Sequence, residues 1–306
     1  MRYLGNKESI VSEIYSLLSD KGLINKELSF FDAFCGSGSV ADYFKEYYNN
    51  IIINDNLTWS VVYTGGRLRS QHCSFSRLGF DPIEYFNNTN DVAHGFIYKN
   101  YSPAESSRMY FTPENAERID FFRSKIEEWK NSSLITDDEY NYLLACLIES
   151  VSDVSNTAGV YGAFLKKWDA RALKPIVFDR VDSKTNKCHK LSTFNSKIEE
   201  IIDTIDCDIL YLDPPYTQNQ YGTQYHLLET LVLDDNPSIS TVTGSRSTAP
   251  MRSDWSKEYK ANILFDRILA KTKARYVILS YNNDGFMSKE YIEAAMKRYG
   301  KSETYV

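Results

Sequence analysis

The chain has little of what marks a secreted, membrane-spanning or metal-bound protein. No apolar run approaches the ~20 residues that a helix needs to cross a bilayer, and residues 1–7 contain no hydrophobic signal segment. Five cysteines, odd in number and widely spaced, argue against a disulfide framework and a Cys-x-x-Cys metal knuckle. Cys188-His189 has no second pair of ligands nearby. We therefore expect a cytoplasmic protein with reduced thiols, no metal and no membrane partner.

An excess of positive charge is also missing. The 306 residues carry 35 Lys and Arg against 41 Asp and Glu, a net charge of -6, which counts against a protein that coats nucleic acid by charge alone. Basic residues do cluster locally, and a shared location beside a site would make them a track for phosphates. The clusters are Arg67, Arg69 and Arg77; Lys166, Lys167, Arg171 and Lys174; and Arg246 and Arg252.

The most informative motif is Asp213-Pro214-Pro215-Tyr216. It follows the apolar run 208–212, which predicts a buried strand that ends at the carboxyl edge of a sheet. The two prolines fix the backbone and remove two N–H donors. The Asp213 carboxylate and the Pro214 carbonyl could accept both hydrogens of an exocyclic amino group, and Tyr216 offers a stacking face. The motif therefore predicts a site for a flat ring that bears an amino group.

A glycine-containing turn precedes this motif in the chain. Residues 28–34 predict a strand, Gly36 and Gly38 allow close backbone approach, and a helix follows, which is the opening of a βαβ unit. A second apolar strand at 51–53 leads to Asp55, 19 residues beyond Gly36, a separation at which a carboxylate can reach a ribose. A structural turn and a turn-capping aspartate remain the alternatives for these two features.

The βαβ pattern stops between about residues 65 and 185. This stretch contains helical patterns at 113–130 and 137–153, and we interpret it as a mainly helical insertion. Strands are expected again near 190–194, 208–212 and 275–281, with a terminal strand from about 302. The prediction is one α/β domain, residues 1–64 and 186–306, that carries an insertion at 65–185.

With these motifs in this order, the chain resembles the S-adenosylmethionine-dependent DNA adenine-N6 methyltransferases of the Dam-like, alpha-ordered (D12) class. The resemblance covers nearly the full length. Its main motifs are Tyr3-Leu-Gly-Asn-Lys7, Phe31 to Ser39, Asn54-Asp55 and Asp213 to Tyr216. Supporting stretches, similar to the branch of FokI-type modification enzymes, are Arg108 to Asn115, Asn156 to Gly162 and Tyr225 to Thr230.

The resemblance implies a Rossmann-like methyltransferase sheet with helices on both faces and an inserted target-recognition domain at 65–185. It implies methyl transfer from S-adenosylmethionine to N6 of an adenine flipped out of double-stranded DNA, within a restriction-modification system. Lys7 is expected to bind the carboxylate of the cofactor's methionine part, and Asp32 to orient the loop or face that part. The implied catalytic residues are Asp213, Pro214, Pro215 and Tyr216. The implied cofactor-binding residues are Tyr3, Asn6, Lys7, Asp32, Phe34, Gly36, Gly38, Asp55, Asn195 and Asp213.

Two groups of alternatives stay open. Related motifs occur in enzymes that methylate cytosine N4, RNA or protein glutamine, and a degenerate, inactive methyltransferase fold could still bind nucleic acid. The resembled fold ends in a hairpin, whereas this sequence encodes one terminal strand. We therefore expect either a truncation relative to the family or a second polypeptide that completes the sheet. The other expected partners are double-stranded DNA and a cognate restriction endonuclease.

Overall fold

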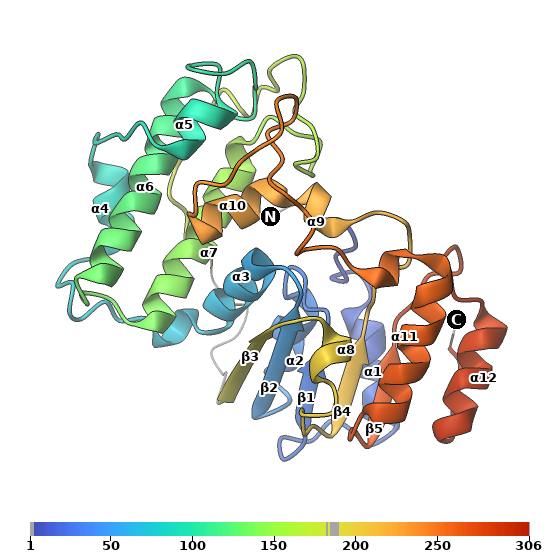
Figure 1. Ribbon diagram of the computed structural model, residues 1–306. Helices are drawn as coiled ribbons and strands as arrows, with labels where there is room; N and C mark the ends of the chain where they lie inside the picture. Colours follow the sequence, from blue (N-terminus) through green and yellow to red (C-terminus); the bar gives the residue numbers. More distant parts are fainter. Residues whose placement is uncertain (1–2, 182, 184–189, 306) are drawn as a thin grey trace.

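A parallel sheet forms the centre of the protein, seen in a computed structural model that describes residues 3–181, 183 and 190–305. Its five strands are all parallel, in the order β3-β2-β1-β4-β5 (Figure 1). The order reverses between β1 and β4, the kind of switch point at which open α/β sheets bind ligands. The expected Rossmann-like α/β fold is confirmed. The strands are β1 (Ser29–Asp32), β2 (Asn50–Asp55), β3 (Lys190–Asn195), β4 (Ile209–Leu212) and β5 (Tyr276–Leu279).

Helices cover both faces of this sheet, which explains why the central strands are apolar without interruption. Every residue of β1 and β4 is buried. Because side chains alternate along a strand, Phe30 packs in the core of one face and Phe31 in the core of the other. The first face is covered by α1 (Val11–Asp20) and α2 (Ser39–Phe44), and the second by α8 (Ile198–Ile201), α11 (Glu258–Lys271) and α12 (Lys289–Tyr299).

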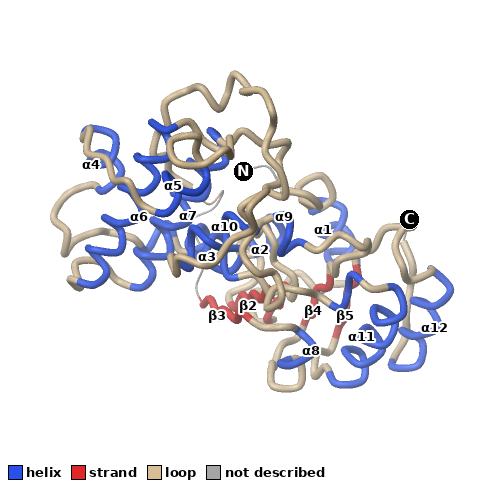
Figure 2. Tube along the Cα trace, turned by 45° about the horizontal axis from the view of Figure 1, so that its top comes forward, coloured by secondary structure: helices blue, strands red, loops and turns tan. Residues whose placement is uncertain are grey.

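A second lobe is mainly helical, as expected for the insertion (Figures 1 and 2). The two predicted long helices are confirmed, and their starts follow the sequence rules. Thr112 caps the first of them and Pro113 begins it, while Thr136 and Glu139 form a capping box at the second. The boundary expected at residue 65 falls inside a helix that follows β2. The helices of this lobe are α4 (Pro82–Asn88), α5 (Phe96–Tyr101), α6 (Pro113–Asn131) and α7 (Asp137–Val154), and α3 (Thr58–Leu68) lies between them and the sheet. Short turns occur at Ser70–His72 and, beside α11, at Asp254–Ser256.

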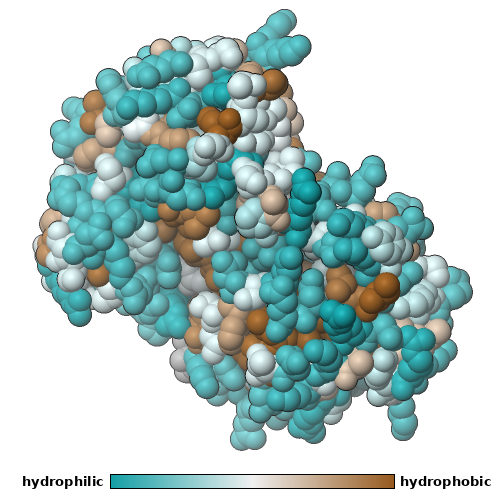
Figure 3. Space-filling view, viewed as in Figure 1, coloured by the Kyte–Doolittle hydropathy of each residue, from teal (hydrophilic) through white to brown (hydrophobic). Residues whose placement is uncertain are grey.

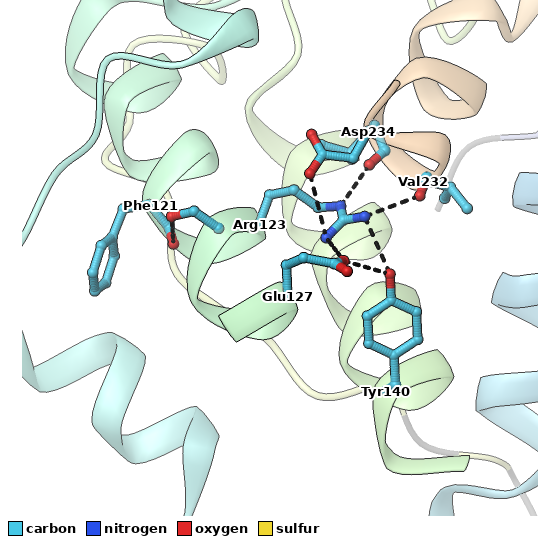
Figure 4. A network of polar contacts seen from close by, with 8 residues as sticks. Phe121, Arg123, Glu127, Tyr140, Val232 and Asp234 are labelled. Carbon is cyan, nitrogen blue, oxygen red and sulfur yellow. Dashed lines mark hydrogen bonds and ion pairs between the residues drawn. The ribbon is translucent and has the colours of Figure 1, made fainter. Parts of the chain in front are cut away.

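Two helices from the segment after the Asp213 motif also join this lobe: α9 (Tyr221–Gln224) and α10 (His226–Leu233). Figure 4 shows the polar contacts by which the buried Arg123 of α6 binds the end of α10. The Arg123 guanidinium donates to the carbonyls of Leu231 at 2.9 Å and Val232 at 3.2 Å. These bonds satisfy carbonyls at the end of α10 that have no partner within the helix. The lobe beside the sheet is therefore larger than the predicted insertion.

The contact between α3 and α7 joins the two lobes, and it depends on Gly66. A Cβ atom at Gly66 would lie 2.4 Å from the backbone oxygen of Asn141 and 3.0 Å from the Cβ atom of Ala145. Alanine at this position must push the two helices apart. We expect Gly66→Ala to lower the free energy of unfolding by about 1–3 kcal/mol, as overpacked cores do, measured by urea denaturation.

Gly65→Ala in the same helix is the matched control. Its Cβ atom would lie 3.6 Å from Cγ2 of Thr193, an ordinary contact. Because alanine is the better helix former, this variant should be as stable as the parent or more stable by up to about 1 kcal/mol. Equal midpoints of urea denaturation for the two variants would contradict the claim that the close contact of α3 with α7 requires Gly66.

The prediction of a terminal strand from about residue 302 is wrong for the described residues up to 305. Residues 301–305 are irregular and mostly exposed, because they carry polar side chains with little apolar surface to bury. Glu303 instead pairs with Lys21 at 2.7 Å. In the described ranges no further strand pairs with β5. Cys188-His189 lies outside those ranges. None of the helices that the structure describes combines the length and apolar character that crossing a membrane requires.

Candidate active site

Three carboxylates gather at the carboxyl edge of the sheet. Asp32 is the last residue of β1, Asp55 is the last residue of β2, and Asp213 directly follows β4. These strands are neighbours, so their ends meet at the place where open α/β sheets bind ligands. All three side chains line one cavity with about 810 Å³ of empty space, part of it open to solvent. Figure 3 shows apolar side chains gathered where the two lobes meet.

The cavity brings together segments that are far apart in the sequence. The turn after β1 and the Asp213 motif face the N-terminal segment across it. Of the residues predicted for the site, Gly38 and Asn195 do not line the cavity, whereas the others do. The lining comes from segments 3–7, 34–37, 39–40, 55–57 and 213–216, with Asp32, Tyr211, Tyr221, Met251 and Ser253.

Asp213 is paired with Lys7. The Lys7 ammonium lies 3.0 Å from Oδ1 of Asp213, and each side chain is 15% exposed. Burial raises the pKa of Asp213 to about 6, although the positive charge of Lys7 opposes this rise. Lys7 thus helps to keep this carboxylate ionised near neutral pH.

Tyr216 stands beside this ion pair. The Lys7 ammonium lies 5.5 Å from the centre of the Tyr216 ring, and the ring meets the edge of Tyr281 at 6.2 Å and 75°. Its backbone oxygen accepts from the N–H of Phe286 at 3.3 Å. These contacts hold a partly exposed aromatic face at the cavity, where a planar ligand could stack on it.

Asp32 is a buried acid without a counterion. It is 1% exposed, and neither carboxylate oxygen has a hydrogen-bond partner of regular geometry among the described residues. Burial, together with the negative charges of Asp213 and Asp55, raises the pKa of Asp32 to about 8. A buried carboxyl group without a partner is costly to maintain. The arrangement therefore suits a ligand that brings positive charge or hydrogen-bond donors to Asp32.

Asp55 organises the glycine turn. Its Oδ2 accepts from the N–H of Gly36 at 3.0 Å and its Oδ1 accepts from the N–H of Leu57 at 2.9 Å. Burial raises the pKa of Asp55, and these two backbone donors oppose the rise. Asp55 is therefore a turn-capping residue, the alternative considered for it. Each carboxylate oxygen keeps a further lone pair, so the same group can also accept from a ligand's hydroxyls.

Gly36 has a left-handed backbone, with φ of +50°, and the Tyr3 ring lies directly over it. A Cβ atom at Gly36 would come within 2.8 Å of that ring, so a larger residue would displace either the turn or Tyr3. The Tyr3 ring in turn packs against Trp59, Tyr221 and Tyr225, with centroids 5.1–5.9 Å apart. An aromatic wall is thus built over the turn.

The remaining predicted residues have supporting positions. Phe34 lines the cavity and meets Trp255 edge-on at 5.4 Å. Asn6 also lines it, and its Oδ1 accepts from the N–H of Glu8 at 2.9 Å. Gly38, with φ of +75°, precedes the first residue of α2. Asn195 is exposed at the end of β3, where its Nδ2 donates to the backbone oxygen of Asp55 at 2.9 Å.

Three residues near the site were missed from the sequence. Tyr221 and Met251 line the cavity. Tyr221 begins the four-residue helix α9 and Met251 lies in the irregular connection after α10, and neither segment has a periodic pattern. Glu229 is buried, and its two carboxylate oxygens accept from the N–H groups of Thr58 and Trp59 at 3.1 and 3.0 Å. It thereby caps α3 just after Asp55. The sequence did contain a signal for this role, because a glutamate within an apolar helix is buried only when it has a partner.

The predicted basic clusters separate into paired and exposed side chains. Arg67 pairs with Asp42 at 2.9 Å, and Arg69 pairs with Asp138 at 3.0 Å. The charge of each arginine is therefore paired within the protein. Arg171 binds two backbone oxygens and Arg246 pairs with Asp235. Five residues of these clusters are exposed, and within the described ranges the structure shows no ion pair for them. They are Arg77, Lys166, Lys167, Lys174 and Arg252.

Known methyltransferases are similar in sequence to this chain over nearly its full length. The sequence pattern of the D12 class N6 adenine-specific DNA methyltransferase family matches residues 3–294. Type II methyltransferase M.FokI of Planomicrobium okeanokoites is 37% identical over 100% of this chain and 48% of its own length. Modification methylase StsI of Streptococcus sanguinis is 36% identical over 98% of this chain and 46% of its own length. Type II methyltransferase M.NlaIII of Neisseria lactamica is 34% identical over 98% of this chain and 89% of its own length. The chain thus spans about half the length of the first two relatives.

Proposed function

The chain belongs to the D12 class N6 adenine-specific DNA methyltransferase family, and from this premise we propose that it methylates N6 of an adenine flipped out of double-stranded DNA, with S-adenosylmethionine as the donor. One observation carries the proposal. The Asp213 motif and the glycine turn face the same cavity, beside the unpaired acid Asp32. The cavity therefore offers one place for an amino group and another for a cationic donor.

The residues fit S-adenosylmethionine, which supplies a methyl group on a positively charged sulfur. Asp32, Asp55 and Asp213 line the cavity with Lys7, so carboxylates outnumber the cation. Asp32 suits the amino end of the donor's methionine part because it is buried and has no counterion among the described residues. Asp55 suits the ribose hydroxyls. We assign the nucleoside to the space beside Phe34 and Gly36.

The substrate amino group is assigned to the Asp213 motif. Its two hydrogens would be accepted by Asp213 and by the carbonyl of Pro214, which draws the nitrogen lone pair out of the ring and toward the methyl group. Tyr216 would hold the extruded base by stacking. These residues supply positioning and a fixed negative charge, and no covalent intermediate on the protein is required.

The position of Lys7 favours a different role from the expected one. Its ammonium lies on Asp213 rather than beside the unpaired Asp32. We assign Lys7 to keeping Asp213 ionised, so that the carboxylate can accept from the substrate amino group. Binding of the donor's carboxylate by Lys7 is the competing assignment, and the two differ in their pH dependence.

The proposal is tested by transfer of labelled methyl from S-adenosylmethionine to plasmid DNA from a methylation-deficient host, followed by nucleoside analysis. Label in N6-methyladenine is the expected result. Label in N4-methylcytosine, or transfer to RNA alone, would replace adenine in DNA as the substrate. Donor binding without any transfer would identify a degenerate, inactive fold.

Donor binding should release protons. Below pH 8 the raised pKa keeps Asp32 largely protonated in the free protein, and a cationic ligand beside it lowers that pKa, so a proton leaves. At pH 7 the calorimetric binding enthalpy should differ between phosphate and Tris buffers, and the difference should vanish near pH 9, where Asp32 is already ionised. Asp32→Asn should abolish the difference. An enthalpy that is the same in both buffers at pH 7 would contradict the assignment of Asp32.

The biological setting is proposed from the relatives, which are named type II methyltransferases and modification methylases. We assign this chain to a cytoplasmic restriction-modification system, where it protects DNA from a cognate restriction endonuclease. The edge of β5, which pairs with no further strand in the described part of the chain, is the place for a strand of a second polypeptide. Protection of methylated plasmid from the endonuclease tests the first assignment, and co-purification tests the second.

A further inference from the structure

The connection between α10 and α11 contains an unusual surface loop, residues 236–246. In Figure 1 it rises beside α5, on the helical lobe. In a chain with a net charge of -6, residues 236–253 contain no carboxylate. Arg252 is exposed, whereas Arg246 pairs with Asp235 at the base of the loop. Six of the residues 238–247 are serine or threonine. A hydroxyl-rich segment with no carboxylate of its own suits a polyanion such as DNA.

The loop is held by the buried side chain of Arg108, which is 8% exposed. Its Nη2 donates to the backbone oxygens of Ser240 and Thr241 at 2.9 and 3.0 Å, and its Nη1 donates to the backbone oxygen of Asn100 at 2.9 Å. A buried guanidinium bound to three carbonyls is a strong anchor. The loop is therefore fixed to the α5 region of the helical lobe.

Two buried tyrosines hold the other limb of the loop. The Tyr101 hydroxyl donates to the backbone oxygen of Gly244 at 2.7 Å. The Tyr110 hydroxyl lies 2.9 Å from the backbone oxygens of both Thr243 and Tyr161. Tyr110 thus keeps this loop beside the segment 156–162. Both limbs of a surface loop are anchored by side chains in the core.

The tip of this anchored loop is apolar. Val242 is 75% exposed, the largest fraction among the large apolar side chains of the described residues. An exposed valine on a mobile loop would need no explanation. Here, however, Arg108 and the two tyrosines fix the backbone on both sides of it. Such a tip can enter another molecule without a large loss of conformational entropy.

The same connection also reaches the cavity. Met251 and Ser253 line it, and the backbone oxygen of Met251 accepts from Nδ2 of Asn56 at 3.1 Å, next to Asp55. Only six residues, Met251 among them, separate Arg246 at the end of the loop from Ser253. The anchored tip and the cavity wall therefore belong to one short segment. A molecule that sends a base into the cavity would pass this segment.

Resting on the proposed function, we propose that Val242 is a wedge that enters the DNA duplex when the target adenine leaves it. Extruding a base costs stacking energy and opens a gap in the base stack. Apolar side chains inserted between bases offset that cost. The hydroxyls of the neighbouring Ser240, Thr241 and Thr243 would contact the adjoining DNA. A reading loop outside residues 65–185 thus joins the recognition surface.

The test compares Val242→Ala and Val242→Asp with Val92→Asp, a matched control at a valine that is 47% exposed between α4 and α5. The substrate is a duplex with the sequence that the unaltered protein is found to methylate. We expect Val242→Ala to lower kcat/KM about 10-fold, and Val242→Asp to lower it further, because the wedge no longer offsets unstacking. Val92→Asp should match the parent. Calorimetric affinity for S-adenosylmethionine should be the same in all four proteins, which shows that the variants fold.

A second substrate separates a wedge from a simple contact. When the target adenine faces an abasic site it is already unpaired, so the Val242→Ala loss should shrink to about 2-fold. Parent-like activity of Val242→Asp on the intact duplex, or an equal loss on both substrates, would overturn the wedge while leaving the proposed function intact. Absence of methyl transfer by the unaltered protein would overturn the proposed function, and the wedge with it.

Discussion

Asn in place of Asp213 is expected to slow methyl transfer to DNA by about 10²- to 10³-fold, the usual effect of removing an electrostatic stabiliser from an active site. The variant keeps the size of the side chain and one acceptor oxygen. It loses the negative charge, and its own NH2 group would face the substrate's NH2 group, donor against donor. The nitrogen lone pair would then stay in the adenine ring. Single-turnover transfer of labelled methyl measures the effect.

Donor affinity separates this explanation from general damage to the site. Because we assign the donor to Asp32 and Asp55, the affinity of Asp213→Asn for S-adenosylmethionine should change by less than about 3-fold, consistent with a group that acts mainly in the transition state. Asp203→Asn is a suitable control, since Asp203 is exposed and pairs with the exposed Lys271 at 3.1 Å. A transfer rate within 3-fold of the parent in Asp213→Asn would refute the proposed role of the carboxylate.

The carboxyl edge of the sheet was predictable because its signals are local. Parallel strands buried on both faces are uninterrupted apolar runs, and the polar residue that ends each run must lie at the sheet edge. Asp32, Asp55 and Asp213 follow from this rule, and all three line the cavity. The long helices of the insertion were predictable for a similar reason, since Thr112 and Thr136 carry capping signals within three residues.

The rest depends on contacts between distant segments, for which the sequence has no periodic signal. Lys7 meets Asp213 across 206 positions. Arg108 anchors a loop more than 130 positions away, and Glu229 caps a helix that begins 171 positions earlier. Asn195 was placed at the cofactor by resemblance, and the structure shows it at the end of β3 with its side chain bound to the backbone oxygen of Asp55. The expected strand after residue 302 required apolar side chains that the segment does not bury.

Replacing Lys7 by methionine should move the acid side of the pH–rate profile upward. In the free protein the pKa of Asp213 is raised to about 6 by burial, and Lys7 opposes that rise. Methionine keeps the length of the side chain and removes the charge, so the pKa of Asp213 must rise further. Loss of an adjacent opposite charge typically changes a pKa by about 1 unit or more. Since the ionised form accepts the substrate's hydrogens, activity should fall about 5-fold or more at pH 6 and recover toward the parent value as the pH rises.

The direction of this change decides between the two assignments of Lys7. If Lys7 acts on Asp213, Lys7→Met shifts the acid limb of single-turnover rates, and Lys7→Arg, which keeps a cation near the carboxylate, largely restores it. If Lys7 instead binds the donor's carboxylate, Lys7→Met weakens the calorimetric affinity for S-adenosylmethionine at every pH. The acid side of the pH–rate profile then stays unchanged. The 3.0 Å contact with Asp213 favours the first outcome, because a buried carboxylate that must work ionised needs a cation held against it.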